Sequence, residues 1–213
     1  LWSGNEFWPA AGFSMMDFLG HPKALYFYAR RFWAPVLICL GPADSNRNAF
    51  VINDTSCSLI VQTQFQLLDI KGSILDQSQS PVSVGPHSTA SVSLSRDLLN
   101  PSCPEKSILY MAVYQQDILL SENTYLFTPD KYAQFRPLDV DISVEAIDHR
   151  SLQYTLQSRW FVKDLQMILE PAAVLSDNFF DMLPGRRYQI RARFPNQAPD
   201  TRHPFILRSS CRA

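Results

Sequence analysis

Metal-binding residues are scarce in this sequence, and none of them is clustered. The chain of 213 residues has four cysteines and four histidines. It contains no C-x-x-C pair and no H-x-H or H-E-x-x-H spacing, although zinc sites need ligands at such short intervals. We therefore expect no metal and no cofactor. For the cysteines we favour free thiols over a disulfide framework; they are Cys39, Cys57, Cys103 and Cys211.

An excess of basic charge and a long apolar run are also missing. The 19 Lys and Arg residues are balanced by 20 Asp and Glu residues, which gives a net charge of −1. A nucleic-acid-binding surface needs clustered basic side chains that displace counterions. The most apolar stretch, residues 24–40, is interrupted by Arg30, Arg31 and Pro35 and is shorter than the roughly 20 residues of a membrane span. The sequence therefore predicts neither a nucleic acid nor a membrane as a partner.

The chain does contain enough apolar sequence for a folded core. Apolar residues make up 46% and charged residues 18% of the chain, which is typical of globular rather than disordered proteins. The length is sufficient for one or two domains. Short alternating segments dominate after residue 36, and they follow an aromatic opening at residues 1–37.

The opening places two tryptophans beside an amide and a carboxylate. Trp2, Asn5, Glu6 and Trp8 fall within seven positions, and Pro9 follows. Sugar rings stack on aromatic side chains while amides and carboxylates bond sugar hydroxyls, so this composition suits a carbohydrate site. An apolar cluster without a ligand is the alternative, and composition alone leaves both open.

We interpret the opening as a strand, an aromatic turn and an amphipathic helix. Pro22 suits the first turn of a helix, where its missing N–H costs nothing. Arg30 and Arg31 complement the helix C-terminus, and Pro35 disfavours its continuation. Phe27 is expected away from the apolar face. Residues at i, i+3, i+4 and i+7 predict that face, and they are Leu25, Tyr28, Ala29 and Phe32.

After the opening, the periodicity becomes that of β-strands. Every second residue is apolar or small in the segment 59–67, which predicts a half-buried strand. Lys71-Gly72 predicts a turn, and residues 81–86, bounded by two prolines, predict a loop. Further strands are expected at residues 36–40, 49–52, 74–75, 90–94, 108–114 and 124–128. Short strands separated by loops predict a small β-sandwich.

One glycosylation sequon occurs, Asn53-Asp54-Thr55. It could carry a glycan in a secretory setting. Asn-Asp at the end of a strand is also favourable turn chemistry, and we favour the turn.

A second module of alternating segments follows a proline-bounded linker at residues 129–137. Strands are expected at residues 138–145, 152–156, 165–169, 188–194 and 203–208, which predicts a second sandwich. The segment 175–185 mixes polar and aromatic residues. We expect its aromatic side chains to fill the end of the sandwich and Pro184-Gly185 to form a turn, with a binding loop as the alternative.

The opening resembles a known enzyme family. Trp2-Ser3-Gly4-Asn5-Glu6-Phe7-Trp8-Pro9 is similar to the W-x-x-N-[DE]-x-W-P signature near the end of the catalytic barrel in glycoside hydrolase family 2 β-mannosidases. Residues 22–37 look like the last helix of that barrel and its exit. Residues 51–72 and 175–185 resemble parts of the two immunoglobulin-like modules that follow the barrel, so the resemblance extends over the whole chain.

The resemblance implies a mainly β fold in which two immunoglobulin-like β-sandwiches follow the last strand-helix unit of a (β/α)8 barrel. The implied domains are a barrel remnant at 1–37, a sandwich at 38–132 and a C-terminal sandwich at 133–213. One strand and one helix cannot close a barrel. We therefore expect the chain to be the C-terminal portion of a longer enzyme, with the missing N-terminal barrel as its partner.

The function implied by the resemblance is hydrolysis, with retention, of terminal β-D-mannose from a β-mannoside or a mannose-containing oligosaccharide. One Glu would act as acid/base and another as nucleophile. Both belong to the missing part of the barrel, so we assign no catalytic residue here and expect the chain to be inactive alone. Gly4-Asn5-Glu6 is also similar to the Asn-Glu pair that carries the acid, but that pair lies in mid-barrel, where several strands and helices would follow.

By resemblance, three residues of the opening would bind substrate. Trp2 would form a wall of the sugar subsite, and Asn5 and Glu6 would bond sugar hydroxyls or support neighbouring catalytic groups. Asp17 is expected to be structural. Exo-β-glucosaminidases and β-galactosidases share this architecture, and a non-catalytic carbohydrate-binding or structural protein made of two sandwiches is a further alternative.

Overall fold

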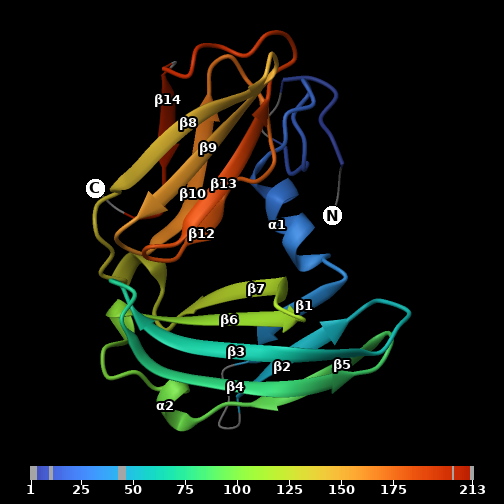
Figure 1. Ribbon diagram of the computed structural model, residues 1–213, viewed down its shortest axis with the longest axis vertical. Helices are drawn as coiled ribbons and strands as arrows, with labels where there is room; N and C mark the ends of the chain where they lie inside the picture. The colour runs from blue at the N-terminus through green and yellow to red at the C-terminus, as the bar shows by residue number, and fades with distance from the viewer. Residues whose placement is uncertain (1–3, 10–11, 43–46, 203, 212–213) are drawn as a thin grey trace. The chain divides into compact units, whose positions relative to one another are not determined.

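The chain folds mainly into antiparallel β-sheets (Figure 1). The structure is a computed structural model that describes residues 4–9, 12–42, 47–202 and 204–211. Two compact units are present: residues 31–134, the middle unit, and residues 1–30 together with 135–213, the C-terminal unit. Each unit contains an immunoglobulin-like β-sandwich, so the predicted fold class is confirmed. The barrel remnant and the predicted domain boundaries stay predictions.

The middle unit contains two antiparallel sheets. One has the strand order β1-β2-β5, from β1 (Val36–Leu40), β2 (Asn48–Asn53) and β5 (Ser88–Ser93). The other has the order β4-β3-β6-β7, from β3 (Leu59–Asp69), β4 (Ile74–Val84), β6 (Ser107–Gln115) and β7 (Ile118–Leu126). A single turn of helix, α2 (Arg96–Leu99), follows β5.

The core of the middle unit follows from the alternation in its strands. On β3 the residues at 61, 63, 65 and 67 are buried, whereas Ile60 and Gln62 are exposed. The predicted half-buried strand is therefore confirmed, because side chains alternate between the two faces of a sheet. The buried face packs with Ile38 of β1 and Val51 of β2, which come from the other sheet.

The connections on either side of β4 differ in how well the sequence predicted them. The turn at Lys71-Gly72 is confirmed: Gly72 has a φ of 87° and donates its N–H to the carbonyl of Asp69 at 3.0 Å. The predicted loop at 81–86 is wrong over its first four residues, because β4 continues to Val84. Pro81 is tolerated there because β4 is an edge strand of its sheet, where a missing N–H need not break a ladder.

The Asn53 sequon forms a buried turn, as we favoured. The Asn53 side chain is fully buried. Its amide nitrogen donates to the carbonyls of Cys57 and Gly85, both at 2.8 Å, and its Oδ1 accepts from the N–H of Thr55 at 3.0 Å. The amide nitrogen that a glycan would need is thus fully engaged inside the fold.

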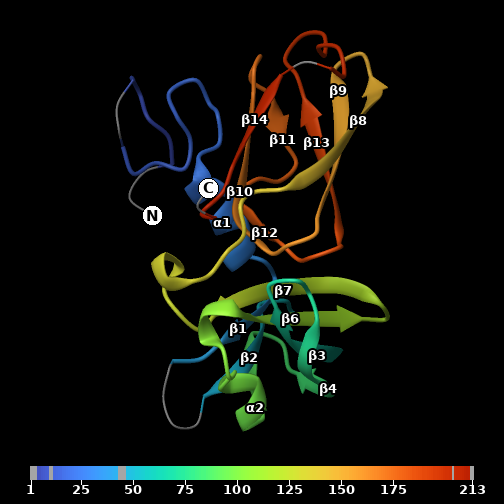
Figure 2. The same ribbon diagram turned by 90° about the vertical axis from the view of Figure 1, so that its left-hand side faces the viewer.

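The C-terminal unit contains the second sandwich and one helix, α1 (Ala24–Phe32), whose last two residues belong to the middle unit. One sheet has the order β11-β13-β9-β8, from β8 (Val140–Asp148), β9 (Ser151–Ser158), β11 (Val174–Leu175) and β13 (Arg187–Arg193). The other has the order β12-β10-β14, from β10 (Val162–Leu169), β12 (Phe180–Met182) and β14 (Phe205–Arg208). Figure 2 shows the two sheets facing each other. No helix of the described ranges is long and apolar enough to cross a membrane.

The segment 175–185 serves the core of this sandwich, as we expected. Phe180 is buried and stacks on Tyr188 with 5.4 Å between ring centroids. Buried Asn178 accepts the N–H of Met167 at 2.8 Å and donates to the Met167 carbonyl at 3.0 Å, so it acts as a short strand partner for β10. Gly185 has a φ of 74° and completes the predicted turn.

Candidate functional site

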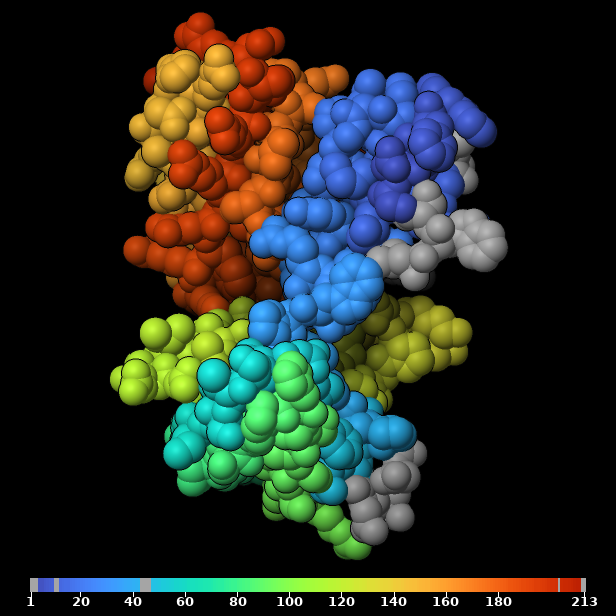
Figure 3. All heavy atoms as spheres, turned by 90° about the vertical axis from the view of Figure 1, so that its right-hand side faces the viewer, coloured from blue at the N-terminus to red at the C-terminus, as the bar shows by residue number. Residues whose placement is uncertain are grey.

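The opening of the chain forms a folded segment on the outside of the C-terminal unit (Figure 3, blue). Main-chain contacts tie residues 4–9 to residues 12–23: Met16 donates to the carbonyl of Gly4 at 3.1 Å and accepts from Glu6 at 3.2 Å. Lys23 donates its N–H to Met15 at 2.8 Å, at the entrance to α1. Residues 4–6 and the entrance to α1 are thus both bonded to the main chain at Met15 and Met16.

The predicted strand at the start of the chain is not formed among the described residues. Asn5 makes one isolated parallel bridge with Met16, and Met16 makes one antiparallel bridge with Pro22. Parallel strands gain their stability within sheets that are covered on both faces. A single bridge on an exposed segment does not extend into a ladder.

Glu6 is held by an ion pair within this segment. Its Oε1 accepts the Lys23 ammonium at 2.6 Å and the N–H of Gly12 at 2.9 Å. The Glu6 side chain is 9% exposed, and a Cβ at Gly12 would lie 2.8 Å from Oε1, so a larger residue at position 12 would displace the Glu6 carboxylate. The hydrogen bond from Lys23 lowers the pKa of Glu6, although burial alone would raise it. Glu6 is therefore an ionised acceptor that closes the loop.

The other predicted sugar-binding residues have different surroundings. Asn5 is exposed. Trp2 lies outside the described residues. Phe7 and Trp8, which follow Asn5 in the sequence, are 83% and 67% exposed, and Phe13 is 87% exposed. The rings of Phe7 and Trp8 lie 6.5 Å apart between centroids, and exposed apolar surface of this kind is typical of regions that bind a ligand or another part of a protein.

Asp17 is structural, as expected. Its Oδ1 accepts the N–H groups of Leu19 and His21, at 2.9 and 2.8 Å, and its Oδ2 lies 3.2 Å from Nδ1 of His21. Burial would raise the pKa of Asp17, but the hydrogen bonds from His21 and Leu19 outweigh it and lower the pKa. Gly20, with a φ of 82°, completes this turn.

The helix that follows presents a different face to the sandwich from the one the spacing predicted. Phe27 and Ala29 are buried, whereas Tyr28 and Phe32 are exposed by more than a third. Phe27 packs on Phe179 of the C-terminal sandwich at 5.9 Å between ring centroids. The predicted stripe was therefore wrong for Phe27, because the partner of a nine-residue helix, rather than its own periodicity, decides which side is covered.

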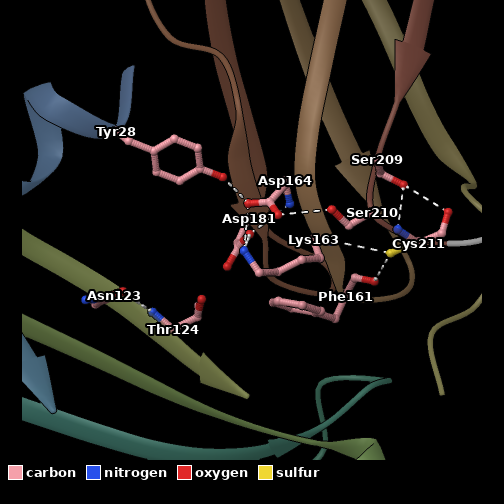
Figure 4. Close-up of polar contacts among 10 residues, drawn as sticks. All are labelled: Tyr28, Asn123, Thr124, Phe161, Lys163, Asp164, Asp181, Ser209, Ser210 and Cys211. Carbon is pink, nitrogen blue, oxygen red and sulfur yellow. Dashed lines mark hydrogen bonds and ion pairs between the residues drawn. The ribbon is translucent and has the colours of Figure 1, made fainter. Parts of the chain in front are cut away.

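A polar cluster fastens α1 to the C-terminal sandwich (Figure 4). We name Tyr28, Lys163, Asp164 and Asp181 the helix clamp. The Tyr28 hydroxyl donates to Oδ1 of Asp164, and the Lys163 ammonium lies 2.6 Å from the same oxygen and 3.1 Å from Oδ1 of Asp181. Ser210 also donates to Oδ2 of Asp164, at 3.1 Å.

A bulge in β10 creates the clamp. The pairing of β10 with β12 shifts register between Val162 and Leu165, and Asp164 has a φ of 53°. Its N–H donates to Asp181 at 2.9 Å. An extra residue in a strand redirects side chains, so both Lys163 and Asp164 take part in the cluster, although neighbours on a regular strand would point to opposite faces.

The charges of the clamp stabilise one another. The Lys163, Asp164 and Asp181 side chains are between 15% and 22% exposed. Burial would lower the pKa of Lys163, but Asp181 and Asp164 outweigh it and raise the pKa. Burial would likewise raise the pKa of Asp164, but the hydrogen bonds from Lys163 and Tyr28 lower it. Burial and the bond to Asp164 raise the pKa of Tyr28, which remains a neutral donor.

Sequence reasoning did not find the partners that organise this region. Lys23 lies 17 positions from Glu6, and Tyr28 lies 136 positions from Asp164. The one available signal was the charged pair Lys163-Asp164 near the start of a mostly apolar strand. Within the described ranges, no group of His, Cys, Asp and Glu residues has the geometry of a metal site.

The fold resembles that of the C-terminal immunoglobulin-like domains of glycoside hydrolase family 2 enzymes. Residues 45–132 match the family described as Mannosidase Ig/CBM-like domain, which corresponds to most of the middle unit. The resemblance inferred from the sequence is therefore confirmed. Among curated proteins there is no match.

Solved structures agree with this class. The chain is similar to the β-D-mannosidase of Dictyoglomus thermophilum, with a TM-score of 0.81 and 20% identity over 98% of this chain and 25% of that one. It is also similar to the exo-chitosanase CsxA of Amycolatopsis orientalis, with a TM-score of 0.68 and 13% identity over 97% of this chain and 29% of that one. The chain thus spans less than a third of the length of these enzymes.

Proposed function

We propose that this chain is the C-terminal portion of a retaining exo-β-mannosidase that hydrolyses terminal β-D-mannose from mannosides and glycans. The observation that carries the proposal is the likeness of almost the entire chain to one quarter of a β-mannosidase. The mannosidase-type module at residues 45–132 supports the same assignment. The β-D-mannosidase and the exo-chitosanase share this fold, so the fold does not distinguish their substrates. The specificity for mannosides is therefore a proposal.

Within this proposal, residues 1–37 are the last strand-helix unit of the catalytic barrel. The exposed rings of Phe7, Trp8 and Phe13 support this role, because they are surface that a missing barrel would cover. The helix clamp would fasten the barrel's last helix to the C-terminal sandwich.

The chain would supply support rather than catalytic carboxylates. Retaining glycosidases need a carboxylate pair about 5–5.5 Å apart, of which the general acid has a raised pKa. The pKa values of Glu6 and Asp17, the two carboxylates of the opening, are both lowered by their hydrogen bonds. Glu6 would therefore act with Asn5 as a hydrogen-bonding or supporting group at the sugar subsite, of which Trp2 would form a wall, beside catalytic groups from the missing barrel.

The proposal is tested by comparing the chain with the complete protein encoded by its gene. On an aryl β-D-mannoside we expect turnover by the complete protein and none by the 213-residue chain. Aryl β-D-glucosaminide and β-D-galactoside, assayed in parallel, distinguish the neighbouring specificities. Preferred turnover of either one would reject the mannosidase assignment, and robust turnover by the chain alone would reject the absence of catalytic carboxylates.

A second function, carbohydrate binding without catalysis, is favoured by the family description of the middle unit, which includes carbohydrate-binding modules. In the other sandwich, half-buried Trp160 has the Arg136 guanidinium 5.4 Å from its ring centroid and is the side chain to test. Titration of mannobiose against the chain distinguishes the two functions. Saturable binding that Trp160→Ala removes and Trp2→Ala does not affect would favour the binding protein.

A further inference from the structure

The C-terminal sandwich has a pocket that is unrelated to the opening of the chain. It lies at one end of the sheet β11-β13-β9-β8, has a volume of about 420 Å³, and is formed by the turn between β8 and β9 and by the end of β13. Sites for small ligands typically measure about 300–1,000 Å³. The lining residues are Asp148, His149, Arg150, Ser151, Arg191 and Arg193.

Strand register brings the arginines of this pocket together. Arg193 of β13 pairs with Ser151 of β9, directly beside the turn that carries Arg150. Arg191 and Arg193 are two residues apart and therefore point to the same face, while Ala192 between them is buried in the core. Three arginine residues thus line one pocket.

Positive charge in the pocket exceeds negative charge. Asp148 pairs with Arg191 at 3.3 Å, and its Oδ1 accepts the N–H of Arg150 at 2.7 Å. That backbone hydrogen bond lowers the pKa of Asp148, although burial alone would raise it. The carboxylate is therefore ionised at neutral pH, and its charge is paired with Arg191. Neither Arg150 nor Arg193 has an ion pair with any residue of the described chain, which leaves two guanidinium groups uncompensated.

We propose that this pocket binds a tetrahedral oxyanion, phosphate or sulfate, either as the inorganic ion or as an ester on a small ligand such as a sugar. Guanidinium groups recognise such anions through paired N–H donors in a planar fork. The guanidinium groups of Arg150 and Arg193 would bind the anion. Arg191, which is paired with Asp148, would line the third side of the binding pocket. The site is independent of the glycosidase assignment.

The test is calorimetric titration of the 213-residue chain at low ionic strength. The probes are inorganic phosphate, sulfate, glucose 6-phosphate and glucose. We expect saturable binding of the three anions and none of glucose. Tighter binding of glucose 6-phosphate than of phosphate identifies an ester as the ligand, and equal binding identifies the inorganic ion. Absence of saturable binding by all three anions overturns the proposal.

A charge-matched pair of double variants separates the pocket from general attraction by basic charge. Arg150→Gln with Arg193→Gln removes the two uncompensated groups, and we expect the affinity to fall at least about tenfold. Arg159→Gln with Arg187→Gln changes the net charge equally at the other end of the same strands, and we expect less than about a twofold change. Equal losses in the two double variants would overturn the proposal. The melting temperature of each variant verifies its folding.

Discussion

Replacement of Lys163 by methionine tests the helix clamp most severely. Methionine keeps much of the side-chain length but removes the ammonium that lies 2.6 Å from Asp164 and 3.1 Å from Asp181. Breaking a buried ion pair costs about 3–5 kcal/mol and breaking an exposed pair about 0–1 kcal/mol. Since these side chains are 15–22% exposed, we expect Lys163→Met to lower the free energy of unfolding by about 2–4 kcal/mol.

The measurement is urea denaturation of the chain at neutral pH, followed by tryptophan fluorescence in a background in which Trp33 is replaced by Phe, so that no tryptophan reports on the middle unit. Lys71→Met is the control, because Lys71 is exposed in the turn between β3 and β4, and we expect a change within about 0.5 kcal/mol. A loss below about 1 kcal/mol for Lys163→Met, which is the level of a surface pair, would refute the clamp as a stabilising unit.

The pH dependence of the clamp has a defined sign. Because the pKa of Asp164 is lowered, its contribution is present above the unfolded pKa of about 3.9 and is lost as pH falls through the folded pKa. Because the pKa of Lys163 is raised, its contribution is present below the unfolded pKa of about 10.4 and is lost as pH rises through the folded pKa. The difference between wild type and Lys163→Met is therefore expected to be largest between these limits.

Three further predictions concern single side chains. Tyr28→Phe removes the hydroxyl bonded to Asp164, and we expect urea denaturation to register a loss of about 1–2 kcal/mol; an unchanged midpoint would contradict this. Asn178→Ala removes both bonds to the backbone of β10 and should cost about 2–3 kcal/mol in the same assay, against a negligible change for exposed Asn196→Ala. Asn53 is expected to stay unglycosylated in a secreting host, and an intact-mass spectrum with a glycan at this position would show that the buried turn is not formed before modification.

Strand positions could be predicted because burial on one face leaves a period of two in the sequence. The segments around Phe65 and Tyr154 alternate strictly, and both residues are fully buried in the cores of their sandwiches. The position of a strand at the edge of a sheet leaves no comparable period in the sequence. Pro81 therefore looked like part of a loop, although it lies in β4, where no further strand of the described chain requires its N–H.

Contacts between distant segments were beyond the reach of periodicity. The choice of Phe27 over Tyr28 as the buried residue of α1 depends on Phe179, which comes from a loop more than a hundred residues later. The clamp depends on a bulge that changes the direction of Lys163 and Asp164. The arginine pocket was missed because Arg191 and Arg193 appear in sequence as the ordinary polar half of an alternating strand, and only the pairing with β9 places them beside Arg150.

The stereochemistry of hydrolysis tests the proposed function most directly. Proton NMR, recorded during the first turnovers of an aryl β-D-mannoside by the complete protein encoded by the gene, identifies the anomer that is released. A retaining β-mannosidase releases β-D-mannose first, which then mutarotates. Initial release of α-D-mannose, or no release of mannose by the complete protein, would contradict the account.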